Sequence, residues 1–216
     1  MKYKYDAVFF DFDGTFADTG EGIFDCVQYA VKSLGKEPLS DEVLRTFIGP
    51  PIFDSFKREL NTTDEESHFA VEKYRELYSK SGIYKFRIYP GTLELIKKLK
   101  ENGMKFAIAS AKPKHFIERI IDFLEIRNLV DCVSCPESDK AKDDKSILIN
   151  RAVDILGVEK SRTLMVGDRH FDINGANRAE VESVGVTYGY GSEEELLSAG
   201  ATYIAHNTEE LDKIIF

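Results

Sequence analysis

The chain has 216 residues, enough for one large domain or for a core domain that carries a smaller insertion. Its composition, 43% hydrophobic and 31% charged, is that of a globular protein and excludes disorder over most of its length. The net charge of −9 disfavours nucleic acid and anionic membranes as partners, and a phosphate substrate would need local positive charge from a metal ion or a lysine.

The N-terminus has no apolar segment of signal-peptide length, and no apolar run approaches the length of a membrane span. We therefore expect a soluble, cytoplasmic protein that contacts no membrane.

The three cysteines are too few for a disulfide framework. Cys132 and Cys135 form a C-x-x-C without a second pair of zinc ligands, so we interpret them as buried residues in and after a strand.

The first expected element is a buried strand at residues 7–10, which ends abruptly in acidic side chains. From about residue 18 the pattern becomes helical, with an apolar stripe over residues 23–34. Ser40 is suited to cap a second helix, and Thr63 with Glu66 is typical of a capping box before a third. Because no convincing strand interrupts this stretch, we predict an inserted all-helical cap domain at residues 18–85.

After the insertion, short apolar runs alternate with helical patterns. The expected strands are residues 106–109 and 163–166, with weaker ones at 129–133, 183–186 and 201–205. Such short continuous runs are typical of parallel strands covered on both faces, and helical spacing at 92–102 and 146–156 separates them. The alternation predicts an α/β fold in which residues 1–17 and 86–216 form a Rossmann-like catalytic core around a doubly wound parallel sheet.

Polar side chains follow three of the expected strands. These are Asp11 and Asp13 after the first, Ser110 and Lys112 (with Ala111 between them) after residues 106–109, and Asp168 and Asp172 after residues 163–166. Ligands of doubly wound sheets bind at the carboxyl ends of the strands, so we expect these residues to converge.

Several carboxylates in one place repel each other unless a cation neutralises them. A hard divalent ion with oxygen ligands, most simply Mg²⁺, satisfies this requirement and leaves room for a phosphate group. Ser110 and a lysine from residues 140–146 supply a hydrogen-bond donor and a positive charge suited to phosphate oxygens. The pattern therefore predicts a phosphoryl-transfer site on an acidic protein.

These residues resemble the four ordered motifs of the haloacid dehalogenase-like hydrolase superfamily, in its phosphatase branch. The matching parts are DFDGT at 11–15, Ser110, a lysine near Lys145, and GDRHFD at 167–172. The resemblance extends over the whole chain and implies a Mg²⁺-dependent phosphatase that hydrolyses small phosphomonoesters through an aspartyl-phosphate. The helical insertion resembles the cap of such proteins and is expected to select the substrate.

The resemblance also implies a role for each motif residue. Asp11 is the nucleophile, Asp13 is the general acid and base, and Lys145 neutralises charge, with Lys142 or Lys140 as alternatives. Mg²⁺ is expected to bind Asp11, Asp168 and the backbone carbonyl of Asp13, with Asp172 in a supporting position. The phosphoryl group is expected to contact the residues Gly14, Thr15, Ser110 and Ala111.

A finer resemblance points to phosphoglycolate phosphatase-like proteins and to a neighbouring group of 5′-nucleotidases. FIGPP at 47–51 is similar to a cap loop of these groups, so Arg45, Gly49 and Pro50 are candidates for substrate selection, and GVTYGYGSEEEL at 185–196 resembles their shared C-terminal segment. Phe16, Thr19 and Ala111 depart from the usual residues.

Three alternatives to a phosphoglycolate phosphatase-like enzyme are kept. They are a 5′-nucleotidase, a phosphomutase, and a non-catalytic regulatory protein of the same fold. Residues 19–23 lack the His or Lys of the sugar-phosphate mutases, which disfavours mutase activity, and the presence of Asp13 disfavours dehalogenation. The sequence leaves the physiological substrate and the oligomeric state open.

Overall fold

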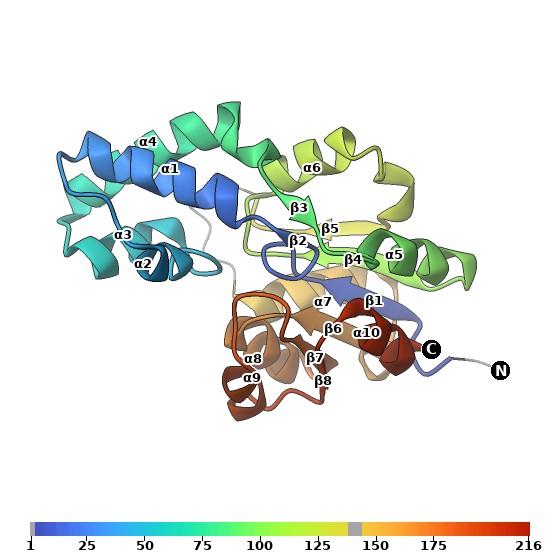
Figure 1. Cartoon of the computed structure of the whole chain (residues 1–216). Helices are drawn as coiled ribbons and strands as arrows, with labels where there is room; N and C mark the ends of the chain where they lie inside the picture. The colour runs from blue at the N-terminus through green and yellow to red at the C-terminus, as the bar shows by residue number, and fades with distance from the viewer. Residues whose placement is uncertain (1–2, 138–143) are drawn as a thin grey trace. The chain divides into compact units, whose positions relative to one another are not determined.

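The computed structural model describes residues 3–137 and 144–216, and the chain forms two compact units. One unit comprises Met1–Ala17 with Ile88–Phe216, and the other comprises Asp18–Arg87. The first unit contains a six-stranded sheet and the second is built from helices (Figure 1).

Every neighbouring pair of strands in the six-stranded sheet is parallel, in the order β5-β4-β1-β6-β7-β8. The strands are β1 (Ala7–Phe10), β4 (Lys105–Ala109), β5 (Cys132–Ser134), β6 (Thr163–Gly167), β7 (Glu182–Val186) and β8 (Tyr203–Ala205). The chain proceeds from β1 to one side and later returns to the other, so β1 lies at the point where the strand order reverses. The predicted doubly wound parallel sheet is confirmed.

Helices follow the strands of this unit along the chain. They are α5 (Thr92–Glu101), α6 (Lys114–Phe123), α7 (Lys145–Leu156), α8 (His170–Ala179), α9 (Glu193–Ser198) and α10 (Thr208–Ile215), with 3₁₀ turns at Arg127–Leu129 and Lys160–Arg162. Helix α7 packs on β4 and β5, and α8 packs on β6 and β7.

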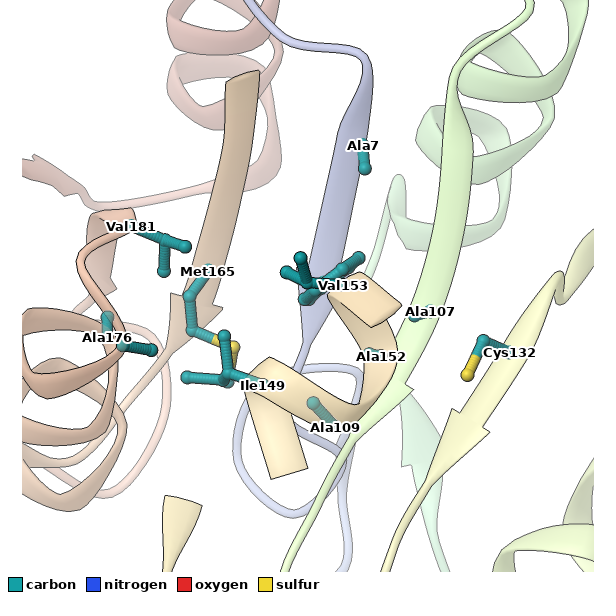
Figure 2. Close-up of a cluster of buried hydrophobic side chains, with 12 residues drawn as sticks. Ala7, Ala107, Ala109, Cys132, Ile149, Ala152, Val153, Met165, Ala176 and Val181 are labelled. Carbon is teal, nitrogen blue, oxygen red and sulfur yellow. The ribbon is translucent and has the colours of Figure 1, made fainter. Parts of the chain in front are cut away.

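Strand β1 is buried on both faces, as its continuous apolar run predicts. Ala7 and Phe9 belong to an apolar cluster with Ile149 and other residues of α7. Figure 2 shows Ala7 and Ile149 in this cluster. Phe10 points to the opposite face, where its ring meets that of Phe106 edge-on at a centroid distance of 5.5 Å. Burial of each large side chain contributes about 1.5–3 kcal/mol, so packing on both faces fixes the strand that leads to Asp11.

The second unit contains α1 (Gly20–Ser33), α2 (Asp41–Arg45), α3 (Ile52–Leu60), α4 (Asp64–Lys80) and the 3₁₀ turn Gly82–Tyr84. The predicted capping box is confirmed, because the backbone N–H of Thr63 donates to Glu66 Oε2 at 2.8 Å and the Glu66 N–H donates to Thr63 Oγ1 at 3.2 Å. The short strands β2 (Ala17–Asp18) and β3 (Arg87–Ile88) form a separate two-stranded sheet that the sequence did not predict.

The C-x-x-C residues behave as ordinary core residues. Cys132 lies in β5 and Cys135 directly after it, and both are buried. Burial raises the pKa of the Cys135 thiol to about 12, so this thiol stays protonated and unreactive. Within the described ranges, no helix is long and apolar enough to cross a membrane.

Candidate active site

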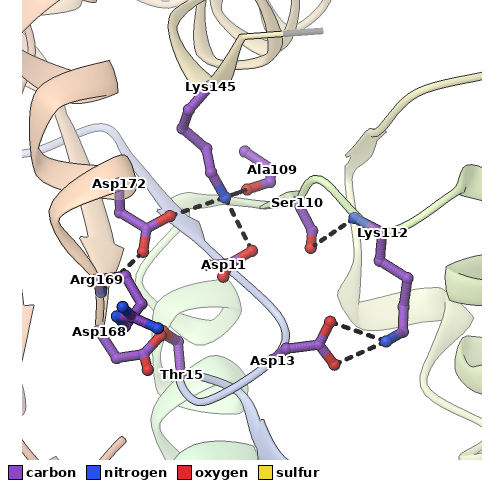
Figure 3. A network of polar contacts seen from close by, with 10 residues as sticks. All are labelled: Asp11, Asp13, Thr15, Ala109, Ser110, Lys112, Lys145, Asp168, Arg169 and Asp172. Carbon is purple, nitrogen blue, oxygen red and sulfur yellow. Dashed lines mark hydrogen bonds and ion pairs between the residues drawn. The ribbon is translucent and has the colours of Figure 1, made fainter. Parts of the chain in front are cut away.

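Three neighbouring strands at the centre of the sheet deliver polar side chains to the same edge. Asp11 follows β1 and its N–H still donates to Val166 of β6, at 2.9 Å. Ser110 follows β4, and Asp168 follows β6. Parallel strands present their carboxyl ends together, so residues that are far apart in the sequence meet here, as Figure 3 shows.

Asp11, Asp168 and Asp172 form a buried cluster of carboxylates. One oxygen from each lies within 4.8 Å of the others. Burial, followed by the charges of Asp172 and Asp11, raises the pKa of Asp168 well above its usual range. Burial is also the main cause that raises the pKa of Asp172, to about 6, although the charge of Lys145 opposes the shift. The fold therefore keeps these acids together at a cost to their ionised forms.

The residues of the cluster fit a divalent cation. When ionised, the three carboxylates carry more negative charge than the single ammonium group of Lys145 can neutralise. All the ligand atoms offered are carboxylate oxygens, which hard cations prefer. A bound divalent ion would offset both the burial and the mutual repulsion that raise the pKa values of Asp168 and Asp172.

Lys145 connects the cluster to the end of β4. Its Nζ lies 2.9 Å from Asp11 Oδ1 and 2.8 Å from Asp172 Oδ1, and it donates to the backbone carbonyl of Ala109 at 3.0 Å (Figure 3). Burial favours the neutral amine, but the charges of Asp11 and Asp172 outweigh this effect and raise the lysine pKa above its ordinary value. Lys140 and Lys142, the alternatives predicted from the sequence, lie outside the described residues.

Lys112 is a site residue to which the sequence analysis gave no role. Its Nζ donates to both carboxylate oxygens of Asp13, at 2.7 and 2.8 Å, and the lysine side chain is 6% exposed (Figure 3). The Asp13 side chain is thus held by Lys112 and is not part of the three-carboxylate cluster. One feature of the sequence could have indicated that Lys112 belongs to the site. It follows Ser110 by two residues at the end of a strand.

The turn that follows β1 packs closely against Asp168. Gly14 has a φ of +84°, and a Cβ atom at this position would lie 2.2 Å from Asp168 Oδ2, so only glycine fits. The Thr15 hydroxyl donates to Asp168 Oδ1 at 3.1 Å, a contact that the sequence did not indicate. This turn therefore helps to hold Asp168 in place.

The remaining predicted phosphate contacts lie after β4. Ser110 is buried, and its Oγ accepts a hydrogen bond from the N–H of Lys112 at 3.3 Å. It is not the N-cap of α6, because that helix begins at Lys114 with Pro113 before it. Ala111 is exposed. The phosphate-binding roles of Gly14, Thr15, Ser110 and Ala111 stay predictions.

The three candidates for substrate selection belong to the helical unit. Arg45 is the exposed last residue of α2, and Gly49 and Pro50 are half-buried in the loop before α3. Pro51 is the N-cap of α3, so the loop also ends one helix and begins the next. The selection roles of Arg45, Gly49 and Pro50 stay predictions.

The carboxylate cluster predicts how pH and Mg²⁺ affect stability together. A carboxyl group whose pKa is raised in the fold stabilises it below the unfolded pKa, and this contribution disappears as pH rises through the folded value. For Asp172 that window runs from about 4, its usual pKa, to about 6, its value in the fold. The metal-free protein should therefore lose stability across this window, and Mg²⁺ should restore it at the upper end.

The measurement is the melting temperature with EDTA and with Mg²⁺, at about pH 5 and pH 7.5. We expect Mg²⁺ to raise the melting temperature by roughly 5 °C more at the higher pH than at the lower pH. For a chain of this size, 1 kcal/mol of stability corresponds to about 2–4 °C in Tm. An equal increase at the two pH values would contradict the assignment of the cluster as a proton-sensitive metal site.

Comparisons with known proteins agree with this geometry. The model of the family described as haloacid dehalogenase-like hydrolase matches residues 8–186. A 5′-nucleotidase of Pseudomonas aeruginosa is 32% identical over 212 residues, which cover 98% of this chain and 96% of that protein. A phosphoglycolate phosphatase of Vibrio parahaemolyticus is 27% identical, with coverage of 95% and 94%.

A solved structure shows the same fold. The crystal structure of a predicted phosphatase from Clostridium acetobutylicum is similar with a TM-score of 0.91 and 33% identity, and the match covers 98% of each chain. The family model spans most of this chain and includes all four motifs. The chain therefore belongs to the haloacid dehalogenase-like hydrolase family, as the resemblance of its motifs predicted.

Proposed function

We propose that this hydrolase cleaves small phosphomonoesters with the help of Mg²⁺ and transfers the phosphoryl group to Asp11. One observation supports the proposal above all others. Asp11 lies beside Lys145 in a buried cluster with Asp168 and Asp172, so a carboxylate that can act as a nucleophile, a positive charge and oxygen atoms that can hold a metal ion are combined.

In the first step a carboxylate oxygen of Asp11 attacks phosphorus, and the bond from phosphorus to the ester oxygen breaks. Asp13 gives its proton to the departing oxygen, so an alcohol leaves. In the second step water attacks the phosphorus of the aspartyl-phosphate, Asp13 takes the proton of the water, and the bond to Asp11 breaks. Inorganic phosphate leaves and both carboxyl groups return to their starting states.

The surrounding side chains stabilise the charge of the transferred group. Mg²⁺, bound by Asp11, Asp168 and the Asp13 carbonyl with Asp172 in support, would supply positive charge to the phosphoryl oxygens. Lys145 adds a second, permanent charge within hydrogen-bond distance of Asp11. Its raised pKa keeps it protonated over the whole physiological pH range.

The proposed substrates are small metabolites of the phosphoglycolate type. The relative from V. parahaemolyticus, named phosphoglycolate phosphatase, supports this choice. A 5′-nucleotidase activity is the second candidate, because the relative from P. aeruginosa carries that name and is more similar to this chain. In either case the helical unit, with Arg45, Gly49 and Pro50, is proposed to select the substrate.

Phosphate release from a panel of monoesters tests the function. The panel contains 2-phosphoglycolate, sugar phosphates, nucleoside monophosphates and p-nitrophenyl phosphate, each with Mg²⁺. The highest kcat/KM for 2-phosphoglycolate supports the first candidate, and the highest value for a nucleotide supports the second. Isomerised product without phosphate release would indicate a phosphomutase, and thermal-shift binding without turnover would indicate a regulatory protein.

Removal of the metal should abolish the activity reversibly. We expect EDTA to reduce turnover of p-nitrophenyl phosphate by at least about 10²-fold, because an uncompensated carboxylate cluster repels the anionic substrate. Excess Mg²⁺ should restore the rate, and far-ultraviolet circular dichroism serves as the control for an intact fold. Full activity after exhaustive chelation would contradict the metal-dependent mechanism.

A further inference from the structure

The segment at residues 188–195 contacts Asp168, one of the proposed metal ligands. The mechanism proposed above gives this segment no role. The backbone N–H of Tyr190 donates to Asp168 Oδ2 at 2.8 Å. The Tyr188 hydroxyl donates to the backbone carbonyl of Thr15 at 3.2 Å, and the Thr15 hydroxyl donates to the other Asp168 oxygen. Both oxygens of Asp168 are therefore oriented by hydrogen bonds that involve this segment or the turn it contacts.

Two glycines let the segment approach this closely. A Cβ atom on Gly189 would lie 2.3 Å from the carbonyl oxygen of Gly14 and 2.4 Å from Asp168 Cβ. A Cβ atom on Gly191 would lie 2.0 Å from the backbone oxygen of Asp168. Since real side chains do not tolerate such distances, the GYG pattern is explained by backbone contact with the Asp168 loop.

Glu195 fixes the next part of the same loop. Its Oε1 accepts from Arg169 Nε at 2.9 Å and from the His170 N–H at 2.9 Å, and it lies 2.6 Å from His170 Nδ1. Burial alone would raise the pKa of Glu195, but the hydrogen bonds from His170 and Arg169 lower it, so the carboxylate stays ionised. Ser192 holds the start of α9, because its Oγ accepts from the Glu195 N–H at 3.1 Å.

The two residues that Glu195 binds, Arg169 and His170, lie between two members of the carboxylate cluster. Arg169 and His170 separate Asp168 from Asp172 in the sequence, and the Arg169 N–H donates to Asp172 Oδ2 at 3.1 Å. A displacement of this backbone would move both carboxylates. Groups that orient metal ligands in this way typically change metal affinity by 10–100-fold when they are lost.

We propose that residues 188–191 and the side chain of Glu195, called here the C-terminal brace, hold Asp168 and Asp172 in the geometry required for metal binding, with Glu195 as a positioning residue. The inference rests on the metal site of the proposed function. It assigns a physical task to the YGYGSEEE part of the sequence, which follows the last catalytic motif by about fifteen residues. The brace acts through the metal ligands, because its contacts are with Asp168 and with the residues beside it.

Direct binding of Mn²⁺ tests the brace without any measurement of activity. Mn²⁺ prefers the same oxygen ligands as Mg²⁺, and its free form is counted by electron paramagnetic resonance. Glu195→Ala should weaken Mn²⁺ binding by about 10–100-fold. Glu194→Ala is the matched control, because Glu194 is exposed on the same helix and its loss changes the net charge equally. The control should bind Mn²⁺ like the unaltered protein.

Glu195→Gln provides a second test in case Glu195→Ala does not fold. It keeps the shape and one acceptor oxygen but loses the charge, so it should show a smaller loss of affinity that still exceeds the Glu194→Ala control. Saturating Mg²⁺ should return the kcat of both Glu195 variants towards the original value, which a general loss of folding would not allow.

The outcomes separate the brace from the proposed function. If the unaltered protein binds no Mn²⁺, the metal site itself is wrong. If the unaltered protein binds Mn²⁺ and the folded Glu195 variants bind it equally well, the brace is wrong and the metal site stands. If only Glu195→Gln folds, its Mn²⁺ affinity is compared with that of the Glu194→Ala control. A weaker affinity supports the brace, and an equal affinity contradicts it.

Discussion

Replacement of Asp11 by asparagine should reduce turnover of p-nitrophenyl phosphate by a factor on the order of 10⁴ or more, because an amide is a poor nucleophile and carries no charge. The change preserves the shape of the side chain and an oxygen that can accept from Lys145. The measurement is phosphate release at saturating Mg²⁺, with the fold checked by thermal melting.

The matched control is Asp154→Asn. Asp154 is exposed on α7, the helix that begins with Lys145, so the control makes the same chemical change on the same element away from the carboxylate cluster. It should retain full activity. An Asp11→Asn protein within tenfold of the original rate would remove Asp11 from the role of nucleophile.

Replacement of Asp13 by asparagine should have an effect that depends on the leaving group. Alkyl phosphates leave as poor alkoxides and need a proton, so the loss for these substrates should be about 10²–10⁴-fold. p-Nitrophenyl phosphate has a good leaving group, so release of p-nitrophenol in the first turnover should be much less affected. The comparison requires rapid-mixing kinetics, because Asp13 is also the proposed base of the second step.

Equal losses of the first turnover for the two substrate classes would contradict the assignment of Asp13 as the acid. Conversion of Lys112 to methionine offers a useful comparison, because it removes the partner that binds both Asp13 oxygens while leaving the carboxyl group present. This variant should lose less activity towards alkyl phosphates than Asp13→Asn does, because the carboxyl group that donates the proton is still present.

The strands of the sheet were predictable where burial is complete. Residues 7–10 and 163–166 are buried at every position and, apart from Thr163, apolar, and the structure places β1 and β6 on them, with Gly167 added to β6. The strand expected at 129–133 lies further along the chain than predicted. Strand β5 covers Cys132–Ser134, and a 3₁₀ turn occupies Arg127–Leu129. Leu129 and Val130 are only partly buried, so hydrophobicity alone gave the wrong boundary.

Other features depend on contacts that no local pattern contains. The strands β2 and β3 have two residues each and are too short to show a period. Lys112 binds Asp13 across 99 positions of the chain, and Thr15 binds Asp168 across 153 positions. The motif residues could be found from strand ends and resemblance, but these partners became visible only when the fold brought the segments together.

The local charge of the site also differs from the charge of the chain. The protein carries −9 overall, yet Lys145 and Lys112 both point their ammonium groups at the motif carboxylates. With a divalent cation on the cluster, the site gains the positive charge that a phosphomonoester requires. Composition predicted that such local compensation was necessary but did not indicate that two buried lysines provide it.

Acid-quenched mass spectrometry of the Asp13→Asn variant tests the aspartyl-phosphate most directly. With p-nitrophenyl phosphate and Mg²⁺, phosphorylation should proceed without an acid, whereas hydrolysis should stall without a base, so the intermediate accumulates. Peptide mapping should then find the mass of one phosphoryl group on Asp11. Release of p-nitrophenol with no phosphoryl group on the protein, or with the group on a different residue, would contradict phosphoryl transfer to Asp11.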